Sequence, residues 1–157
     1  MKFSNEAQVL SKLLISNDLT ISVAESCTGG SLSRALTSIP GASSYFDCGY
    51  ITYSNQSKTE MLGVDIQTIK TFGAVSEEVA LEMVIGLATR SHSDIAVSVT
   101  GVAGPTGGTS EKPVGMVCFG FSYEDKTSTS TQLFSGDRAS IVSQSVSYAL
   151  KQLSVRF

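Results

Sequence analysis

The chain has 157 residues, of which 41% are apolar and 16% are charged, and its formal net charge is −3. That length suits one domain, and we expect a single domain over residues 1–157. A slightly acidic chain without a run of basic residues lacks the electrostatic footprint of a nucleic-acid-binding protein. No apolar run reaches membrane-spanning length, and the first residues do not form an unbroken apolar segment. We therefore expect a cytoplasmic protein with neither nucleic acid nor membrane as partner.

The number and spacing of cysteines and histidines limit which disulfides, metal sites and nucleophiles the chain can form. The three cysteines, Cys27, Cys48 and Cys118, are odd in number and widely spaced, which predicts neither a disulfide framework nor a zinc site. Cys48 and Cys118 are interpreted as core residues. His92 is the only histidine, so any nucleophile that relies on histidine must use this one residue. We expect no metal and no cofactor.

The first elements in chain order are a covering helix, a strand and a second helix. A leucine stripe after a Ser4 cap predicts a helix that ends near Asn17. Ile21 and Val23 alternate with polar neighbours, as in a half-buried strand. Apolar residues at helical spacing then predict a helix that stops around Pro40.

The stretch AESCTGG, residues 24–30, links this strand to the second helix. Small residues of this kind let the backbone approach a ligand closely. Ser26 and Cys27 are expected at the carboxyl end of a strand and just before a helix N-terminus, where open α/β sheets place ligands and nucleophiles. The alternative is a glycine-rich turn without chemistry. Glu25 either orients the site or caps the following helix, and both interpretations stay open.

A second strand and a short helix follow. Residues 48–53 are rich in β-branched and aromatic side chains, which predicts a strand. Ser54 or Asn55 is a good N-cap for a helix that should end at Gly63. Lys58 would lie in its first turn, against the positive end of the helix dipole, where acidic residues are favoured. A residue that breaks a local rule is a candidate functional residue, and a solvated lysine is the alternative.

The remaining elements continue an α/β pattern. Ser76 caps a long amphipathic helix that carries His92 at its carboxyl end, and residues 95–100 predict a central strand buried on both faces. The glycine-rich loop 101–108 follows. A hairpin ends in an edge strand over 126–134 with a wet face, which makes the sheet mixed, and Asp137 caps the last helix.

Both glycine-rich loops open at one edge of the sheet if the strands that end at Ala24 and Thr100 run parallel. Their hydroxyls, backbone amides and a helix N-terminus would then form a cradle for a phosphate or a developing oxyanion. Neither loop matches the P-loop or the dinucleotide fingerprint, so ATP or NAD binding by those devices is not predicted. His92 would lie at the opposite edge, too far away to serve Ser26 as a base.

A serine nucleophile therefore needs another base, and Lys58 is the candidate. It must be neutral, which desolvation, a nearby cation or the helix N-terminus would each promote. Tyr53 relays the proton, orients the lysine or is an ordinary strand aromatic. Cys27 is either a rival nucleophile, because a helix N-terminus lowers a thiol pKa, or an apolar filler. Arg138 and Lys112 are candidate phosphate ligands or solvated surface charges.

Six motifs together resemble one protein family. They are, in order, AESCTGG, GYITYSNQSK, GAVSEEVA, SVTGVAGPTGG, KPVG and FSGDR. The chain resembles the CinA carboxyl-terminal domain family from about Val9 to Leu153, and this family includes bacterial nicotinamide-mononucleotide amidohydrolases. The resemblance implies a three-layer α/β/α sandwich with a mixed, mostly parallel central sheet. We do not expect the amino-terminal domain to which this module is often fused.

The resemblance also implies a reaction. Nicotinamide mononucleotide would be deamidated to nicotinate mononucleotide and ammonia, in pyridine-nucleotide (NAD) salvage, with Ser26 as nucleophile, Lys58 as general base and Tyr53 assisting. The implied substrate-binding residues are Glu25, Cys27, Thr28, Gly29, Gly30, Thr100, Gly101, Gly104, Thr106, Gly107 and Arg138. We expect a homo-oligomer. The alternative is a non-catalytic nucleotide-sensing or partner-binding module of the same family.

Overall fold

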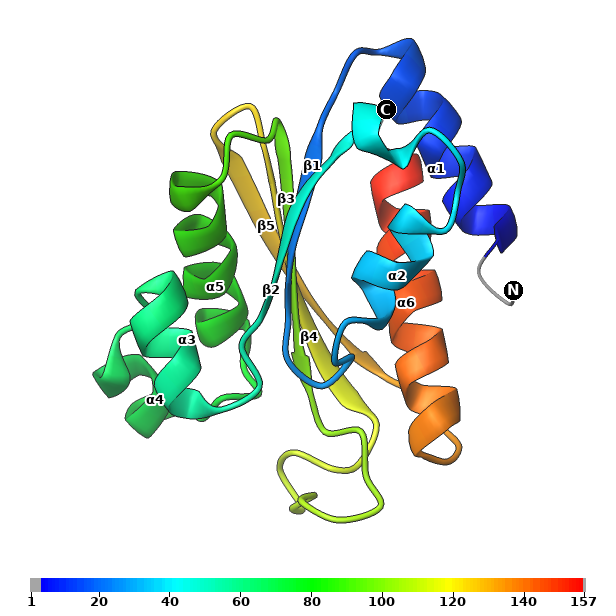
Figure 1. The fold of residues 1–157 in the computed structure, drawn as a ribbon. Coiled ribbons are helices and arrows are strands. Elements are labelled where there is room, and N and C mark those ends of the chain that lie inside the picture. Colours follow the sequence, from blue (N-terminus) through cyan, green and yellow to red (C-terminus); the bar gives the residue numbers. More distant parts are fainter. Residues whose placement is uncertain (1–3, 157) are drawn as a thin grey trace.

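The computed structural model of the protein describes residues 4–156, which form a central sheet with helices on both faces (Figure 1). Its elements are α1 (Ser4–Ser16), β1 (Ile21–Glu25), α2 (Ser31–Thr37), the 3-10 helix η1 (Ala42–Ser44), β2 (Phe46–Ile51), α3 (Asn55–Leu62), α4 (Ile66–Phe72), α5 (Glu77–Arg90), β3 (Ile95–Gly101), β4 (Met116–Tyr123), β5 (Lys126–Leu133) and α6 (Arg138–Ser154). Helices α1, α2 and α6 cover one face, and α3, α4 and α5 lie on the other. The predicted three-layer α/β/α fold is confirmed.

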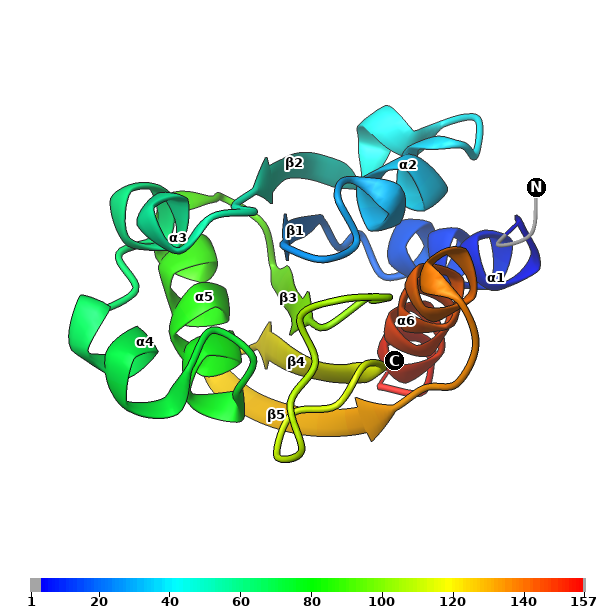
Figure 2. The ribbon, with the colours of Figure 1, turned by 90° about the horizontal axis from the view of Figure 1, so that it is seen from below.

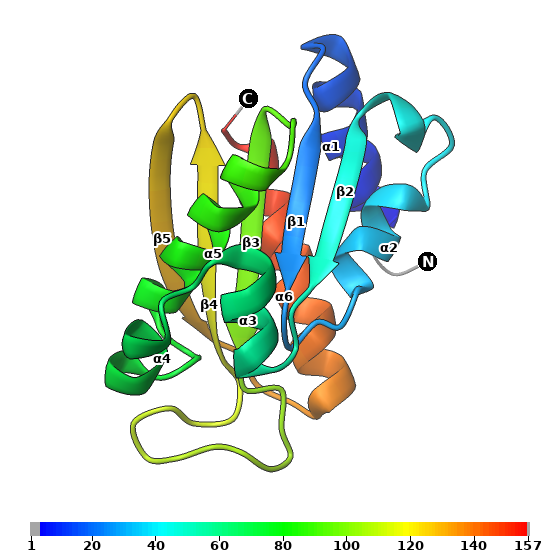
Figure 3. The ribbon, with the colours of Figure 1, turned by 60° about the vertical axis from the view of Figure 1, so that its left-hand side comes forward.

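The order of the strands is β2-β1-β3-β4-β5. Strand β1 pairs in parallel with β2 and with β3, whereas β4 is antiparallel to β3 and to β5. The predicted parallel arrangement of β1 and β3 is thus confirmed. The carboxyl ends of β1, β2 and β3 meet at the lower edge of the sheet in Figure 3. Open α/β sheets bind ligands at this kind of edge.

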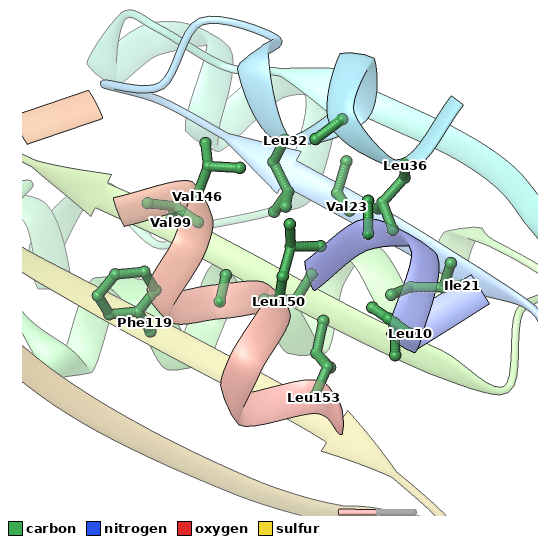
Figure 4. Packing of buried hydrophobic residues seen from close by; sticks show 14 of the residues in the cluster. Leu10, Ile21, Val23, Leu32, Leu36, Val99, Phe119, Val146, Leu150 and Leu153 are labelled. Carbon is green, nitrogen blue, oxygen red and sulfur yellow. The ribbon is translucent and has the colours of Figure 1, made fainter. Parts of the chain in front are cut away.

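Two hydrophobic cores hold the sheet between the helix layers. The larger core joins α1, α2 and α6 to the sheet (Figure 4), and its labelled members are Leu10, Ile21, Val23, Leu32, Leu36, Val99, Phe119, Val146, Leu150 and Leu153. The smaller core lies on the side of α3, α4 and α5 and contains Ala24, Leu62, Val64, Ile69, Val79, Met83, Val84, Leu87 and Ala96. Because β1 and β3 contribute to both cores, the loops at their carboxyl ends project from a rigid platform.

Strand β1 differs from its predicted half-buried state, because all five of its residues are buried. The strand lies between β2 and β3 and has a helix layer on each face, so no side of it reaches water. Its polar side chains find partners inside the protein. Ser22 Oγ, for example, donates to Ser91 Oγ at 2.9 Å. The alternation of polar and apolar residues therefore reflects internal hydrogen bonding rather than solvent contact.

Some boundaries also differ from the predicted ones. Helix α2 ends at Thr37, earlier than the expected stop around Pro40, and β2 begins at Phe46 and ends at Ile51. Helix α4 was not predicted; it has 7 residues and is capped by Asp65, whose carboxylate accepts from the amide of Gln67. Only Ile69 of this helix is buried, so the helix lacks a continuous apolar face that would give a periodic signal. Within residues 4–156, no helix has both the length and the apolar character that a membrane span requires.

Candidate active site

A cavity of 340 Å³ opens at the carboxyl ends of the parallel strands. Figure 2 looks onto this edge of the sheet, with the long loop between β3 and β4 in front. The cavity is lined by Ser26, Cys27, Tyr53, Asn55, Lys58, Ala74, Val75, Thr100, Gly101, Val102, Ala103, Gly104, Thr106, Gly107 and Arg138. Its volume is within the range of small-molecule sites. Both glycine-rich loops reach it, as predicted from the parallel strands.

The side chains of Ser26 and Lys58 meet inside this cavity. Lys58 Nζ lies 2.8 Å from Ser26 Oγ. Lys58 is 1% exposed and Ser26 is 7% exposed, although both line the cavity. A lysine is almost never buried to this extent without partners, so its environment is built for this contact. A nucleophile and a base within hydrogen-bond reach form the geometry that nucleophilic catalysis needs.

Two main-chain carbonyls orient the Lys58 amine. Nζ donates to the carbonyl oxygens of Thr52, at 2.9 Å, and of Tyr53, at 3.3 Å. A carbonyl oxygen only accepts, so a neutral amine must turn both of its N–H bonds toward these oxygens. Its lone pair then points at Ser26 Oγ, which must donate. Burial lowers the pKa of Lys58 from 10.5 to about 8, which makes the neutral form accessible near neutral pH.

The local sequence explains how Lys58 reaches this position. Ser54 caps α3 by accepting from the amide of Ser57, and Gly63 ends the helix in a left-handed conformation. The first turn of α3 therefore starts directly beyond β2, beside the strand end that carries Ser26. The solvated-lysine alternative is wrong, because the Lys58 side chain points into the protein.

Tyr53 touches the lysine through its backbone rather than its phenol. The phenol oxygen accepts from Arg138 Nη2 at 2.7 Å, and the Tyr53 side chain is 56% exposed. Arg138 Nη1 donates to the carbonyl oxygen of Gly104, also at 2.7 Å. The structure thus has Tyr53 orienting Lys58 by its carbonyl and shows no contact through which the phenol would relay a proton. Arg138 links Tyr53 to the second glycine-rich loop.

Cys27 lines the cavity, but its environment suppresses the thiolate. Burial raises the pKa of the Cys27 thiol to about 12. The amide of His92 donates to the carboxylate of Asp47 at the amino end of β2, so the histidine lies at the opposite edge of the sheet, as predicted. Burial thus outweighs the expected lowering of the thiol pKa, and the nearby carboxylate of Glu25 adds a smaller effect that also raises this pKa.

The carboxylate of Glu25 is buried and accepts four hydrogen bonds. Oε1 accepts from Thr28 Oγ1 at 2.7 Å and from the Leu32 amide at 2.8 Å. Oε2 accepts from the Ser33 amide at 2.9 Å and from Ser33 Oγ at 2.7 Å. Glu25 is therefore the cap of α2, which decides between the two interpretations of this residue. The expected helix N-terminus is not open to a ligand.

Four of the predicted binding residues do not line the cavity: Glu25, Thr28, Gly29 and Gly30. The turn that they form leads away from the cavity into α2, which lies on the face of the sheet opposite α3, α4 and α5. Their contribution to substrate binding stays a prediction. The other predicted site residues, including Thr100 and Thr106, all line the cavity.

Replacing Glu25 by glutamine is expected to lower the free energy of unfolding by about 2–4 kcal/mol. Each carboxylate oxygen accepts two hydrogen bonds, so the amide NH₂ of glutamine would face donors whichever way it turned. Urea denaturation measures the change. Glu111→Gln, at an exposed carboxylate, is the matched control and should leave the midpoint unchanged. Equal midpoints for the two variants would contradict the capping role.

Sequence reasoning missed some of the cavity wall: Asn55, Ala74, Val75, Val102 and Ala103. Ala74 and Val75 belong to the connection between α4 and α5, and Thr100 Oγ1 binds the carbonyl oxygen of Ala74 at 2.9 Å. The motif GAVSEEVA contains both residues, but nothing in it shows that they reach the ends of β1 and β3. The position of Ala74 and Val75 at the cavity depends on how α4 and the connection after it pack against the rest of the fold.

Fold and site together define an α/β/α protein with a buried serine–lysine pair at the carboxyl edge of its sheet. The family model of the CinA C-terminal domain matches residues 4–157, and the chain belongs to this family. Crystal structures of relatives have the same fold. The competence/damage-inducible protein CihA of Agrobacterium tumefaciens is 39% identical, with a TM-score of 0.95 over 99% of this chain and 95% of that one. A CinA superfamily protein of Escherichia coli is 34% identical, with a TM-score of 0.95 over 99% and 90%.

Curated relatives fall into two groups by length. The nicotinamide-nucleotide amidohydrolase PncC of Enterobacter agglomerans is 48% identical over 132 residues, which cover 83% of this chain and 80% of that protein. The CinA-like protein of Endomicrobium trichonymphae is 48% identical over 153 residues, or 96% of this chain. The chain spans only 36% of that protein and 27% of the CinA-like protein of Chlorobium limicola.

Proposed function

We propose that this protein is an amidohydrolase that converts nicotinamide mononucleotide to nicotinate mononucleotide and ammonia in pyridine-nucleotide salvage. The observation that carries the proposal is the 2.8 Å contact between Lys58 Nζ and Ser26 Oγ inside a cavity of substrate size. A relative that matches the chain over most of both lengths is named a nicotinamide-nucleotide amidohydrolase. The expected cytoplasmic location and homo-oligomeric state belong to the same proposal.

The reaction would begin with proton transfer from Ser26 to neutral Lys58. Ser26 Oγ attacks the carboxamide carbon, and the carbonyl oxygen becomes an oxyanion. The backbone amide of Cys27, which lines the cavity beside Ser26, would donate to this oxyanion. The Lys58 ammonium then protonates the departing nitrogen, the C–N bond breaks, and ammonia leaves an acyl-serine. Lys58 next deprotonates a water molecule, which cleaves the ester and restores the serine.

The charge of the cavity supports a nucleotide substrate. Within the part of the chain that the structure describes, no carboxylate lines the cavity, and its basic lining side chains are Lys58 and Arg138. Lys58 must be neutral in the reaction, so Arg138 supplies the positive charge. A cationic wall favours a substrate that carries a phosphate. Arg138 lies near the exposed phenol of Tyr53, away from the buried reacting atoms, where a phosphate could stay partly solvated.

The direct test is an ammonia-release assay on the purified protein with nicotinamide mononucleotide. We expect one ammonia for each nicotinate mononucleotide formed, with both products quantified in the same reaction. Titration calorimetry with the same compound measures binding independently. Binding without turnover would contradict the amidohydrolase proposal and select the alternative, a non-catalytic nucleotide-sensing module.

A further inference from the structure

The loop between β3 and β4, residues 102–115, projects beyond the sheet (Figures 1 and 3). Its base is tied to the sheet, because the Val102 amide donates to the carbonyl oxygen of Met116 at 2.9 Å and the Gly115 amide to that of Val102 at 2.8 Å. The part beyond this base still supplies cavity wall, including Thr106 and Gly107. Contacts with elements other than the sheet must therefore fix the position of this part of the cavity wall.

Lys112 provides such a contact. Its Nζ donates to the carbonyl oxygen of Phe72, the last residue of α4, and at 2.5 Å to that of Val75 in the connection between α4 and α5. The Lys112 backbone is fastened in turn, since its amide donates to Thr109 Oγ1 at 3.0 Å and its carbonyl accepts from the Thr109 amide at 2.9 Å. Lys112 does not line the cavity, so the structure does not support its predicted role as a phosphate ligand.

The α4–α5 connection, to which Lys112 is hydrogen-bonded, also forms part of the cavity wall. Val75 and Ala74 both line the cavity, and Thr100 Oγ1 anchors Ala74 to β3. The same loop is held from α6, where Arg138 donates to the carbonyl of Gly104. Two cations thus fasten the loop between α6 and the α4–α5 connection, by charge-assisted hydrogen bonds that are stronger than neutral ones.

We propose that Lys112 is a positioning residue that holds the loop 102–115 against the α4–α5 connection and so preforms the substrate cavity. This inference rests on the proposed function. Without the Lys112 contact, substrate binding would have to order the loop. The conformational entropy lost in this ordering would weaken the affinity for the substrate. Ser26 and Lys58 are held by β1 and α3, so the chemical step itself does not need the contact.

Kinetics of two variants test the inference. Lys112→Met should raise the KM for nicotinamide mononucleotide by about tenfold or more and leave kcat within about twofold. Lys112→Arg keeps a charged donor and should restore KM to within about threefold of the wild-type value. Lys126→Met, at an exposed lysine of the β4–β5 hairpin, is the matched control and should leave both constants unchanged. An unchanged KM in Lys112→Met, or a loss confined to kcat, would overturn the inference.

Amide hydrogen exchange of the unliganded protein separates this inference from the proposed reaction. In Lys112→Met, exchange should accelerate in residues 102–115 and 72–76 and stay unchanged in β1 and α3. Unchanged exchange in the loop would rule out the tether even if turnover is observed. If the wild-type protein binds nicotinamide mononucleotide without releasing ammonia, the proposed reaction fails, and a tenfold weaker Kd in Lys112→Met by calorimetry would still support the positioning role.

Discussion

Replacing Ser26 by alanine should abolish ammonia release from nicotinamide mononucleotide, with a loss of about 10⁴-fold or more in kcat. The variant lacks the oxygen that would attack the carboxamide, and the remaining lining residues supply no activated substitute. The fold should persist, because Lys58 is the one hydrogen-bond partner of Ser26 Oγ among the described residues, and the backbone amide of residue 26 still binds the carbonyl of Val99. Ammonia release at saturating substrate measures the loss, and thermal denaturation verifies the fold.

Cys27→Ala is the matched control for Ser26→Ala, since it removes the neighbouring side chain from the same turn. Its activity should stay within about threefold of wild type, because the thiol, whose pKa is raised to about 12, is protonated at neutral pH. His92→Ala, at the opposite edge of the sheet, should be equally mild. Severe loss in Cys27→Ala together with an active Ser26→Ala would replace the serine mechanism by a thiol mechanism.

Replacing Lys58 by methionine should lower kcat by about 10³-fold or more, because no other base within residues 4–156 forms a hydrogen bond with Ser26 Oγ. The pH dependence of the wild-type enzyme identifies the base. The reaction needs neutral Lys58, whose pKa burial lowers to about 8, so kcat/KM should rise with pH and level off above pH 8. At pH 7 only about a tenth of the enzyme would have the neutral amine. A profile that is flat between pH 6 and pH 9 would contradict Lys58 as the base.

Lys58 should also make stability depend on pH, whatever the reaction. Its pKa is about 8 in the folded protein and 10.5 ordinarily, so between these values the unfolded chain binds more protons and the free energy of unfolding rises with pH. Between pH 8 and pH 10 the wild-type protein should gain about 2 kcal/mol relative to Lys58→Met. Urea denaturation of both proteins at each pH measures this difference. Lys126→Met should show no such trend against wild type, and an equal trend in both variants would argue against a perturbed lysine.

The sequence alone determined much of the fold because the relevant signals are local. Caps at Ser54, Ser76 and Asp137 and the glycine at position 63 mark helix ends within a few residues of their own position. Alternation over 116–123 and the turn at Glu124–Asp125 predict the hairpin in the same way. Helix α4 escaped prediction because Ile69 is its one buried residue, whereas α2, of the same length, buries Leu32, Ala35 and Leu36.

For the site, the sequence identified the participants but not their contacts. Ser26 is conspicuous in a glycine-rich turn after a strand, and Lys58 because it sits where a helix prefers an acid. Only the tertiary structure decided that Lys58 Nζ lies within hydrogen-bond distance of Ser26 Oγ and of the carbonyl oxygens of Thr52 and Tyr53. It also decided that Glu25 caps α2 and that Lys112 binds the α4–α5 connection. Each of these outcomes depends on which layer a side chain faces and on what a distant segment presents there. Local propensity carries no information about either, because both are set when the helices pack onto the two faces of the sheet.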